Sequence, residues 1–221
     1  ATYLYFLAAA GDEEAPWLAK GTRRMWEDKM REAERDAVEN LACQTSAEAL
    51  TEAHARGRER IEYLADVGRE AILSIERLCD AEATEEVLQE EVGRLTREKD
   101  YLLKKLAQEV ADRADAKGWE LHTPETSAPS REGVDRVPQR LIPGLLTLCD
   151  LSPEDRPAYE EATGGQNPMW SRPLILALYR ADGKRSVDEI ERLVTLEVGE
   201  SDVDLLPYFR FLEEQGLVEW I

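Results

Sequence analysis

The sequence predicts a mainly α-helical protein: a long-helix hairpin or bundle of coiled-coil character, then a small winged-helix-like module with a short terminal β-strand. Between residues 12 and 117 the only proline is Pro16, near the start, and internal prolines break helices. Apolar residues there recur every three or four positions, as on one face of a helix. The C-terminal residues hold helix-capping signals followed by a short apolar run. These three observations define the fold class.

Residues 1–11 form the first predicted segment, a short helix that is apolar on all sides and ends at Gly11. Such a helix needs a surface that buries it. We therefore expect 1–11 to be the terminal helix of a domain whose body lies upstream. A signal peptide fits less well, because no Lys or Arg precedes the apolar run and Asp12, Glu13 and Glu14 follow it at once.

Residues 12–117 are predicted to hold three long helices, at about 16–44, 47–79 and 85–116, with a turn at 80–84. One face of the first helix carries Trp26, Met30, Ala33, Ala37 and Leu41. Apolar positions spaced alternately three and four apart form a coiled-coil-type seam on the other two. The seam consists of Ile61, Leu64, Ile75, Leu78, Leu88, Leu95, Leu102 and Leu106, with Lys99 interrupting one position.

This seam has two interpretations that the spacing alone does not separate. A helix of 30 residues is about 45 Å long, too long for a compact small domain. The seam therefore closes an intramolecular bundle, or it pairs with a second subunit as a dimerisation arm. In either case Lys99 would help to fix the register of the helices.

The C-terminal part divides into a linker at 118–137, rich in turn-forming residues, and a module at 138–221. Ser186 and Glu189 have the spacing of a capping box, Asp202 is expected to cap the next helix, and 217–221 reads as a terminal strand. The predicted core of the module, in which aromatic residues also bury, consists of Trp170, Leu174, Leu178, Ile190, Leu193, Leu206, Phe209 and Leu212. Tyr179 is expected to bury as well.

Composition limits the classes of partner. Acidic residues outnumber basic ones by 47 to 28, and the net charge is −19. Such a surface repels nucleic-acid phosphates and anionic lipids, and no run reaches the roughly 18–20 apolar residues of a membrane span. The three cysteines, Cys43, Cys79 and Cys149, are far apart and form no CxxC pair, as in a reducing compartment. We expect a cytoplasmic protein with no nucleic-acid or membrane partner.

The sequence contains no motif that predicts a catalytic site. The only histidines, His54 and His122, have no ligand-type residue at metal-site spacing, and no nucleophile, phosphate-loop or dinucleotide motif is present. Paired carboxylates such as Glu90 and Glu91 are expected to be solvated. We therefore expect no catalytic, metal-binding or cofactor-binding residue in this chain.

Two resemblances bear on function. The last fifty residues, with Asp182–Ile190 and Phe211–Val218, resemble small peptide-recognition winged-helix domains. Over more of the chain, Tyr3–Gly11, Val137–Gly144 and Asn167–Leu174 resemble the tail of bacterial di-zinc aminopeptidase-like proteins. The second resemblance implies an upstream catalytic domain that would hold the zinc and the general base, since no residue here matches those groups.

Three functions follow as hypotheses. The leading one is a non-catalytic accessory and assembly region, homo-oligomeric or packed on an upstream catalytic domain of a zinc aminopeptidase-like protein. The second is an adaptor whose winged helix binds a peptide or protein, for instance by strand addition at the terminal strand. The third is a transcription regulator with a coiled-coil dimer arm. It is disfavoured because the last predicted helix and its cap carry Asp202, Asp204, Glu213 and Glu214 against Arg210.

Overall fold

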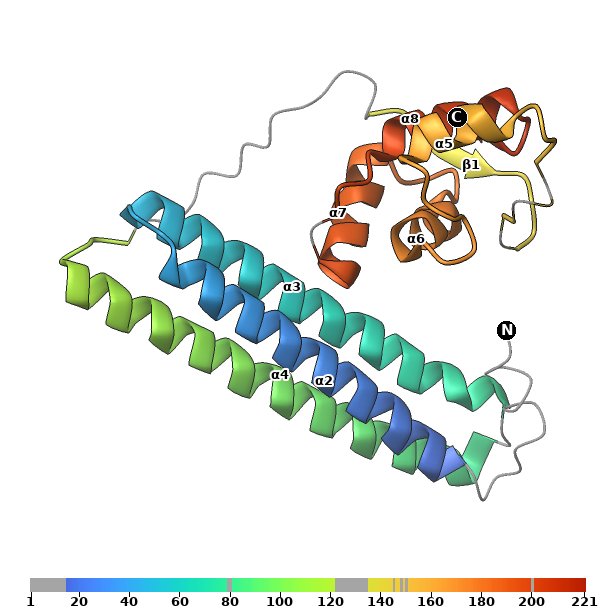
Figure 1. Ribbon diagram of the computed structural model, residues 1–221. Coiled ribbons are helices and arrows are strands. Elements are labelled where there is room, and N and C mark those ends of the chain that lie inside the picture. Colours follow the sequence, from blue (N-terminus) through green and yellow to red (C-terminus); the bar gives the residue numbers. More distant parts are fainter. Residues whose placement is uncertain are drawn as a thin grey trace. The chain divides into compact units, whose positions relative to one another are not determined.

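The chain divides into two units, Ala1–Thr126 (unit 1) and Ser127–Ile221 (unit 2), in a computed structural model. The residues that the structure describes are 15–78, 81–121, 135–144, 146–147, 149, 151–199 and 201–221. Over these residues the fold is mainly helical, as predicted, and it contains a small two-stranded sheet (Figure 1). The predicted helix at 1–11 and most of the predicted linker lie outside the described residues.

Three long helices form unit 1: α2 (Ala15–Ala42), α3 (Ala47–Leu73) and α4 (Ala81–Lys117). A 3₁₀ turn, η1 (Ser74–Leu78), follows α3. Each long helix packs against the other two (Figure 1). The predicted turn at 80–84 is wrong, because α4 already begins at Ala81. Its first turn is made of alanines and glutamates, which favour a helix.

The core of unit 1 lies along the shared axis of the three helices. The predicted face of α2 is buried there, from Trp26 to Leu41. Apolar side chains of α3 and α4 meet it, so each helix buries one stripe and exposes the rest to water. The unit is therefore an intramolecular bundle, one of the two arrangements that the spacing of the seam allowed.

Glycines on α3 let it approach α2 closely. A Cβ atom built on Gly57 would lie 2.6 Å from the Cβ of Ala37, and one on Gly68 would lie 2.8 Å from Cγ of Trp26. Both distances are shorter than carbon atoms tolerate. The spacing between α2 and α3 therefore depends on these two glycines.

Replacing Gly57 by alanine is expected to lower the free energy of unfolding of the bundle. Overpacking of a core costs about 1–3 kcal/mol, which exceeds the gain of about 1 kcal/mol in helix propensity. Gly21 on α2 is the matched control, because a Cβ there would meet nothing within 4 Å. Gly21→Ala should stabilise by about 0.5–1 kcal/mol. Urea denaturation followed by circular dichroism checks both, and equal effects would contradict the close approach.

Unit 2 contains four short helices and two strands among its described residues. These elements are β1 (Pro138–Arg140), α5 (Arg156–Thr163), α6 (Arg172–Arg180), α7 (Val187–Val198), α8 (Leu205–Glu214) and β2 (Val218–Trp220). The strands are antiparallel, with Gln139 opposite Glu219. On its other edge β1 contacts the segment after α6, where Gly183 N donates to Pro138 O at 3.1 Å. Strand β1 is thus bonded on both sides.

Local signals explain where the helices of unit 2 begin. The predicted capping box is confirmed: Ser186 Oγ accepts from Glu189 N at 3.2 Å, and Glu189 Oε2 accepts from Ser186 N at 2.9 Å. The predicted cap at Asp202 is wrong, because Asp204 caps α8 through Leu206 N at 3.0 Å. Helix α5 was not predicted. Its signal is Pro157 in the first turn, a position that proline favours.

Aromatic rings fill the centre of unit 2. Tyr159 on α5 packs edge-on against Phe211 with ring centroids 5.5 Å apart, and its hydroxyl donates to Gln166 O at 2.9 Å. Burial raises the pKa of Tyr159 to about 12, and a hydrogen bond with Thr163 lowers it slightly. Burial also raises the pKa of Tyr208. Both rings are therefore held in the neutral form.

Unit 2 is expected to lose stability in alkali. An unfolded tyrosine ionises near pH 10, whereas folded Tyr159 stays protonated to about pH 12. Its contribution is fully present below pH 10 and is lost as the pH rises to about 12, at about 1.4 kcal/mol per pH unit. Urea midpoints of the wild type and of Tyr159→Phe, measured at intervals above pH 9, should show a shallower decline for the variant. Parallel declines would contradict this.

Candidate protein-association surfaces

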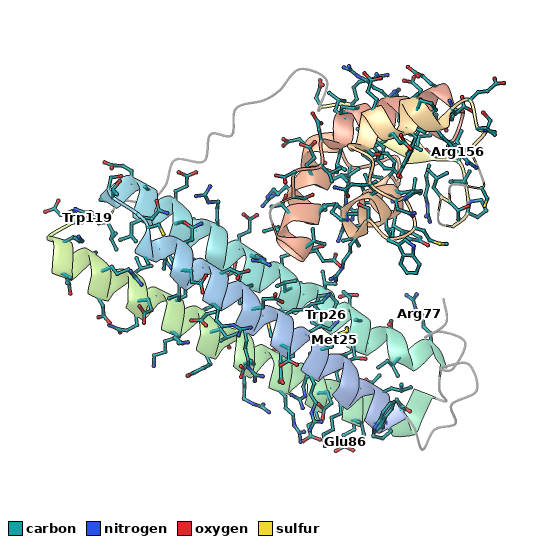
Figure 2. All side chains as sticks on the ribbon, viewed as in Figure 1. Met25, Trp26, Arg77, Glu86, Trp119 and Arg156 are labelled. Carbon is teal, nitrogen blue, oxygen red and sulfur yellow. The ribbon has the colours of Figure 1, made fainter. Side chains whose placement is uncertain are left out.

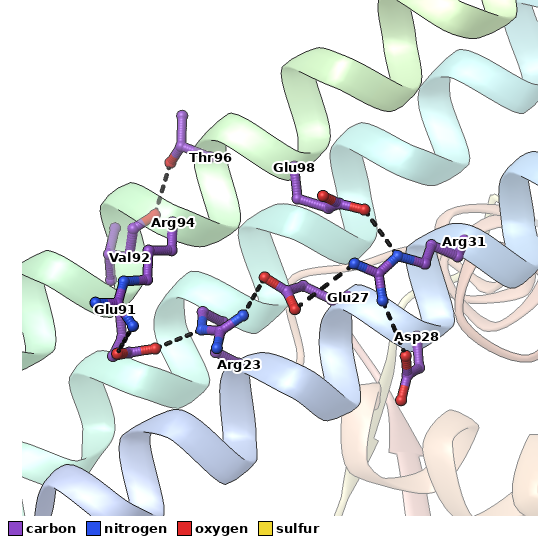
Figure 3. A network of polar contacts seen from close by, with 9 residues as sticks. All are labelled: Arg23, Glu27, Asp28, Arg31, Glu91, Val92, Arg94, Thr96 and Glu98. Carbon is purple, nitrogen blue, oxygen red and sulfur yellow. Dashed lines mark hydrogen bonds and ion pairs between the residues drawn. The ribbon is translucent and has the colours of Figure 1, made fainter.

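A row of ion pairs joins α2 to α4 (Figure 3). Arg23 donates from Nε to Glu91 and from Nη1 to Glu27. Two turns further along, Arg31 Nε donates to Glu98 Oε1 at 2.8 Å. The row is continued by an ion pair between Lys105 Nζ and Glu34 Oε1 at 3.0 Å. Partner numbers rise together on both helices, so α2 and α4 run parallel.

The innermost part of this row is buried. The side chains of Arg23 and Glu91 are 11% and 7% exposed. Burial lowers the pKa of Arg23, but its hydrogen bonds to Glu91 and Glu27 outweigh that effect, so the pKa is raised. The expectation that Glu91 is solvated is wrong. It faces the groove between two helices, and the neighbouring Glu90 points outward, where it accepts from Arg94 at 2.6 Å.

The row of ion pairs is a structural feature. Each buried carboxylate here forms an ion pair with a guanidinium or an ammonium group. A groove of about 460 Å³ lies beside it, lined by Asp28, Arg31, Glu34, Arg35, Glu98, Tyr101, Leu102 and Lys105. Most of the charges around the groove pair with one another. The arrangement fixes the register of α2 and α4.

Another side of α2, away from its buried face, carries an exposed apolar stripe near its N-terminus, which includes Met25 (Figure 2). Trp17 is 71% exposed and Met25 is 49% exposed. Gly21 lies midway between them and is also exposed. Among the described residues, neither Lys20 nor Arg24, which flank the stripe, has an ion-pair partner. The sequence contains this stripe at a spacing of four, but the periodicity of the buried face does not reveal it.

The residues of the predicted seam are brought together in unit 1. Seven of them are buried in its core: Ile61, Leu64, Ile75, Leu88, Leu95, Leu102 and Leu106. The side chain of the eighth, Leu78, lies outside the described residues. Lys99 is half-buried and pairs with Asp100 at 3.5 Å. These seven side chains contact the chain's own helices, so they offer no free surface to a partner.

Six of the eight residues predicted for the core of unit 2 are buried in the structure, and two are not. Buried there are Leu174, Leu178, Ile190, Leu206, Phe209 and Leu212. Leu193 is only half-buried. Trp170 is wrong as a core residue, since it is 80% exposed. It precedes α6 in a turn in which its N–H donates to Asn167 O at 3.1 Å, and that turn lies outside the packed faces of the helices.

Tyr179, also expected to bury, is exposed near the end of α6. Its ring is covered on one side by the Arg140 guanidinium, 4.7 Å from the ring centroid. A second such contact places Arg136 4.1 Å from the centre of the Trp220 ring. Unit 2 thus has two exposed aromatic rings on its surface. The ring of Trp170 is uncovered, and the ring of Tyr179 is partly covered by Arg140.

The terminal strand β2 is paired along one edge, with β1. Ile221 N donates to Val137 O and Leu141 N donates to Leu217 O, both at 2.9 Å, so β2 is fully paired with β1. The side chain of Val218 is only 2% exposed and packs in the core of unit 2, whereas Glu219 and Ile221 are exposed. Among the described residues, no strand pairs with the edge of β2 that faces away from β1.

The exposed side of α8 does not suit nucleic acid. Its exposed residues are Pro207, Arg210, Glu213 and Glu214, and the rest of the helix is buried. A helix that reads a DNA groove presents several donors and cations. Here two carboxylates stand beside one arginine. This surface is therefore expected to repel nucleic-acid phosphates, as is the negatively charged protein as a whole.

Metal ligands do not converge in the described part of the chain, where no group of three His, Cys, Asp or Glu could hold an ion. His54 lies half-buried on α3, and burial lowers its pKa. His122 is outside the described residues. These residues therefore do not fit a zinc site. Within the described ranges, no helix is long and apolar enough to cross a membrane.

Comparison of the chain with protein-family profiles, with curated proteins and with solved structures finds no match.

Proposed function

We propose that this chain is a non-catalytic accessory and assembly region that associates with other protein surfaces. The observation that carries the proposal is the exposure of large apolar side chains on both units: Trp17 and Met25 on α2, and Trp170 before α6. Both units already have closed cores, so these side chains are not needed for folding. Exposed apolar side chains that gather on a surface mark interaction sites.

The resemblance to the tail of di-zinc aminopeptidase-like proteins supplies the context of the proposal. The segments that carry it include Val137–Gly144 and Asn167–Leu174. The second of these contains Trp170. In this context unit 2 would be a winged helix that packs on a catalytic domain or controls access to it, and zinc would belong to that domain.

Size-exclusion chromatography with light scattering tests the assembly role. The full chain is expected to form a discrete oligomer whose population rises with protein concentration. A mass that stays at 25.1 kDa over a hundredfold range of concentration would overturn self-assembly. The range should span about the micromolar to the submillimolar, where weak interfaces associate.

A second candidate function, peptide binding by unit 2, is favoured by Trp170. Bare tryptophans are common anchors of binding surfaces. Amide chemical shifts of the labelled chain, followed on addition of a pool of random synthetic peptides, test it. Shifts confined to residues 168–172 would support a binding surface at Trp170. Shifts at 217–221 would indicate strand addition instead, and the absence of any shift would reject peptide binding.

A further inference from the structure

We draw no further inference here: the strongest candidate, the exposed apolar surface that Met169 and Trp170 form in the turn before α6, carries nothing beyond the proposed function, because nothing in the described part of the structure shows what covers it.

Discussion

Replacing Arg23 by methionine is expected to lower the free energy of unfolding of unit 1 by about 3–5 kcal/mol. The guanidinium of Arg23 is the group that holds both Glu91 and Glu27, whose side chains are 7% and 10% exposed. Removing it takes the most buried cation from both carboxylates. Glu91 then keeps only the partly exposed Arg94, at 3.0 Å, and Glu27 only the partly exposed Arg31, at 3.9 Å. Breaking a buried pair in this way costs far more than the intact pair contributes.

Urea denaturation followed by the helical circular dichroism signal measures this effect. Arg58→Met on α3 is the matched control, because Arg58 forms an ion pair with Glu62 at 2.9 Å on the surface. Such pairs contribute about 0–1 kcal/mol. The double variant Arg23→Met with Glu91→Met should recover much of the loss, because it removes one buried charge together with its partner. A loss for Arg23→Met no larger than that for Arg58→Met would show that the groove is well hydrated.

Replacing Phe209 by alanine is expected to cost unit 2 about 3–5 kcal/mol. Phe209 is fully buried, and its ring contacts Tyr208 and Trp220 with centroids 5.7 and 6.2 Å apart. Its removal leaves a cavity between α8 and β2, and the neighbouring rings are too rigid to fill it. The lost dispersion contacts and the cavity both contribute to the cost.

Trp170→Ala is the control for this prediction, because it removes a still larger ring from the same unit. With 80% of Trp170 exposed, its loss should change the free energy of unfolding by less than about 0.5 kcal/mol. The ring-proton signals of Tyr159 report the unfolding of unit 2 in urea. A comparable destabilisation by both variants would mean that Trp170 packs in the core after all.

The helical pattern was predictable where periodicity and burial agree. The stripe from Trp26 to Leu41 is buried as expected, because residues three and four apart share a helix face. Glu91 could not be placed in the same way. Whether a carboxylate is buried depends on a cation 68 residues away, Arg23, and no local pattern connects the two.

In unit 2, too, local interactions were predictable from the sequence and long-range contacts were not. The capping box at Ser186 is a local interaction over three residues, so its sequence signature was sufficient. The burial predicted for Trp170 is wrong because hydrophobicity alone does not specify burial, and the turn that carries Trp170 lies off the packed faces of the helices. Strand β1 depends on pairing with β2 about eighty residues later, and a three-residue strand has no periodicity to detect.

The parallel alignment of α2 and α4 also sets where the first of these helices begins and the last one ends. With three helices, the N-terminus of α2 and the C-terminus of α4 stand at opposite ends of the bundle. A two-helix hairpin or a four-helix bundle would bring them to the same end. Helix α2 alone, with 28 residues, spans about 42 Å. The bundle is therefore a rigid rod that holds Ala15 and Lys117, near its two ends, at least about that distance apart.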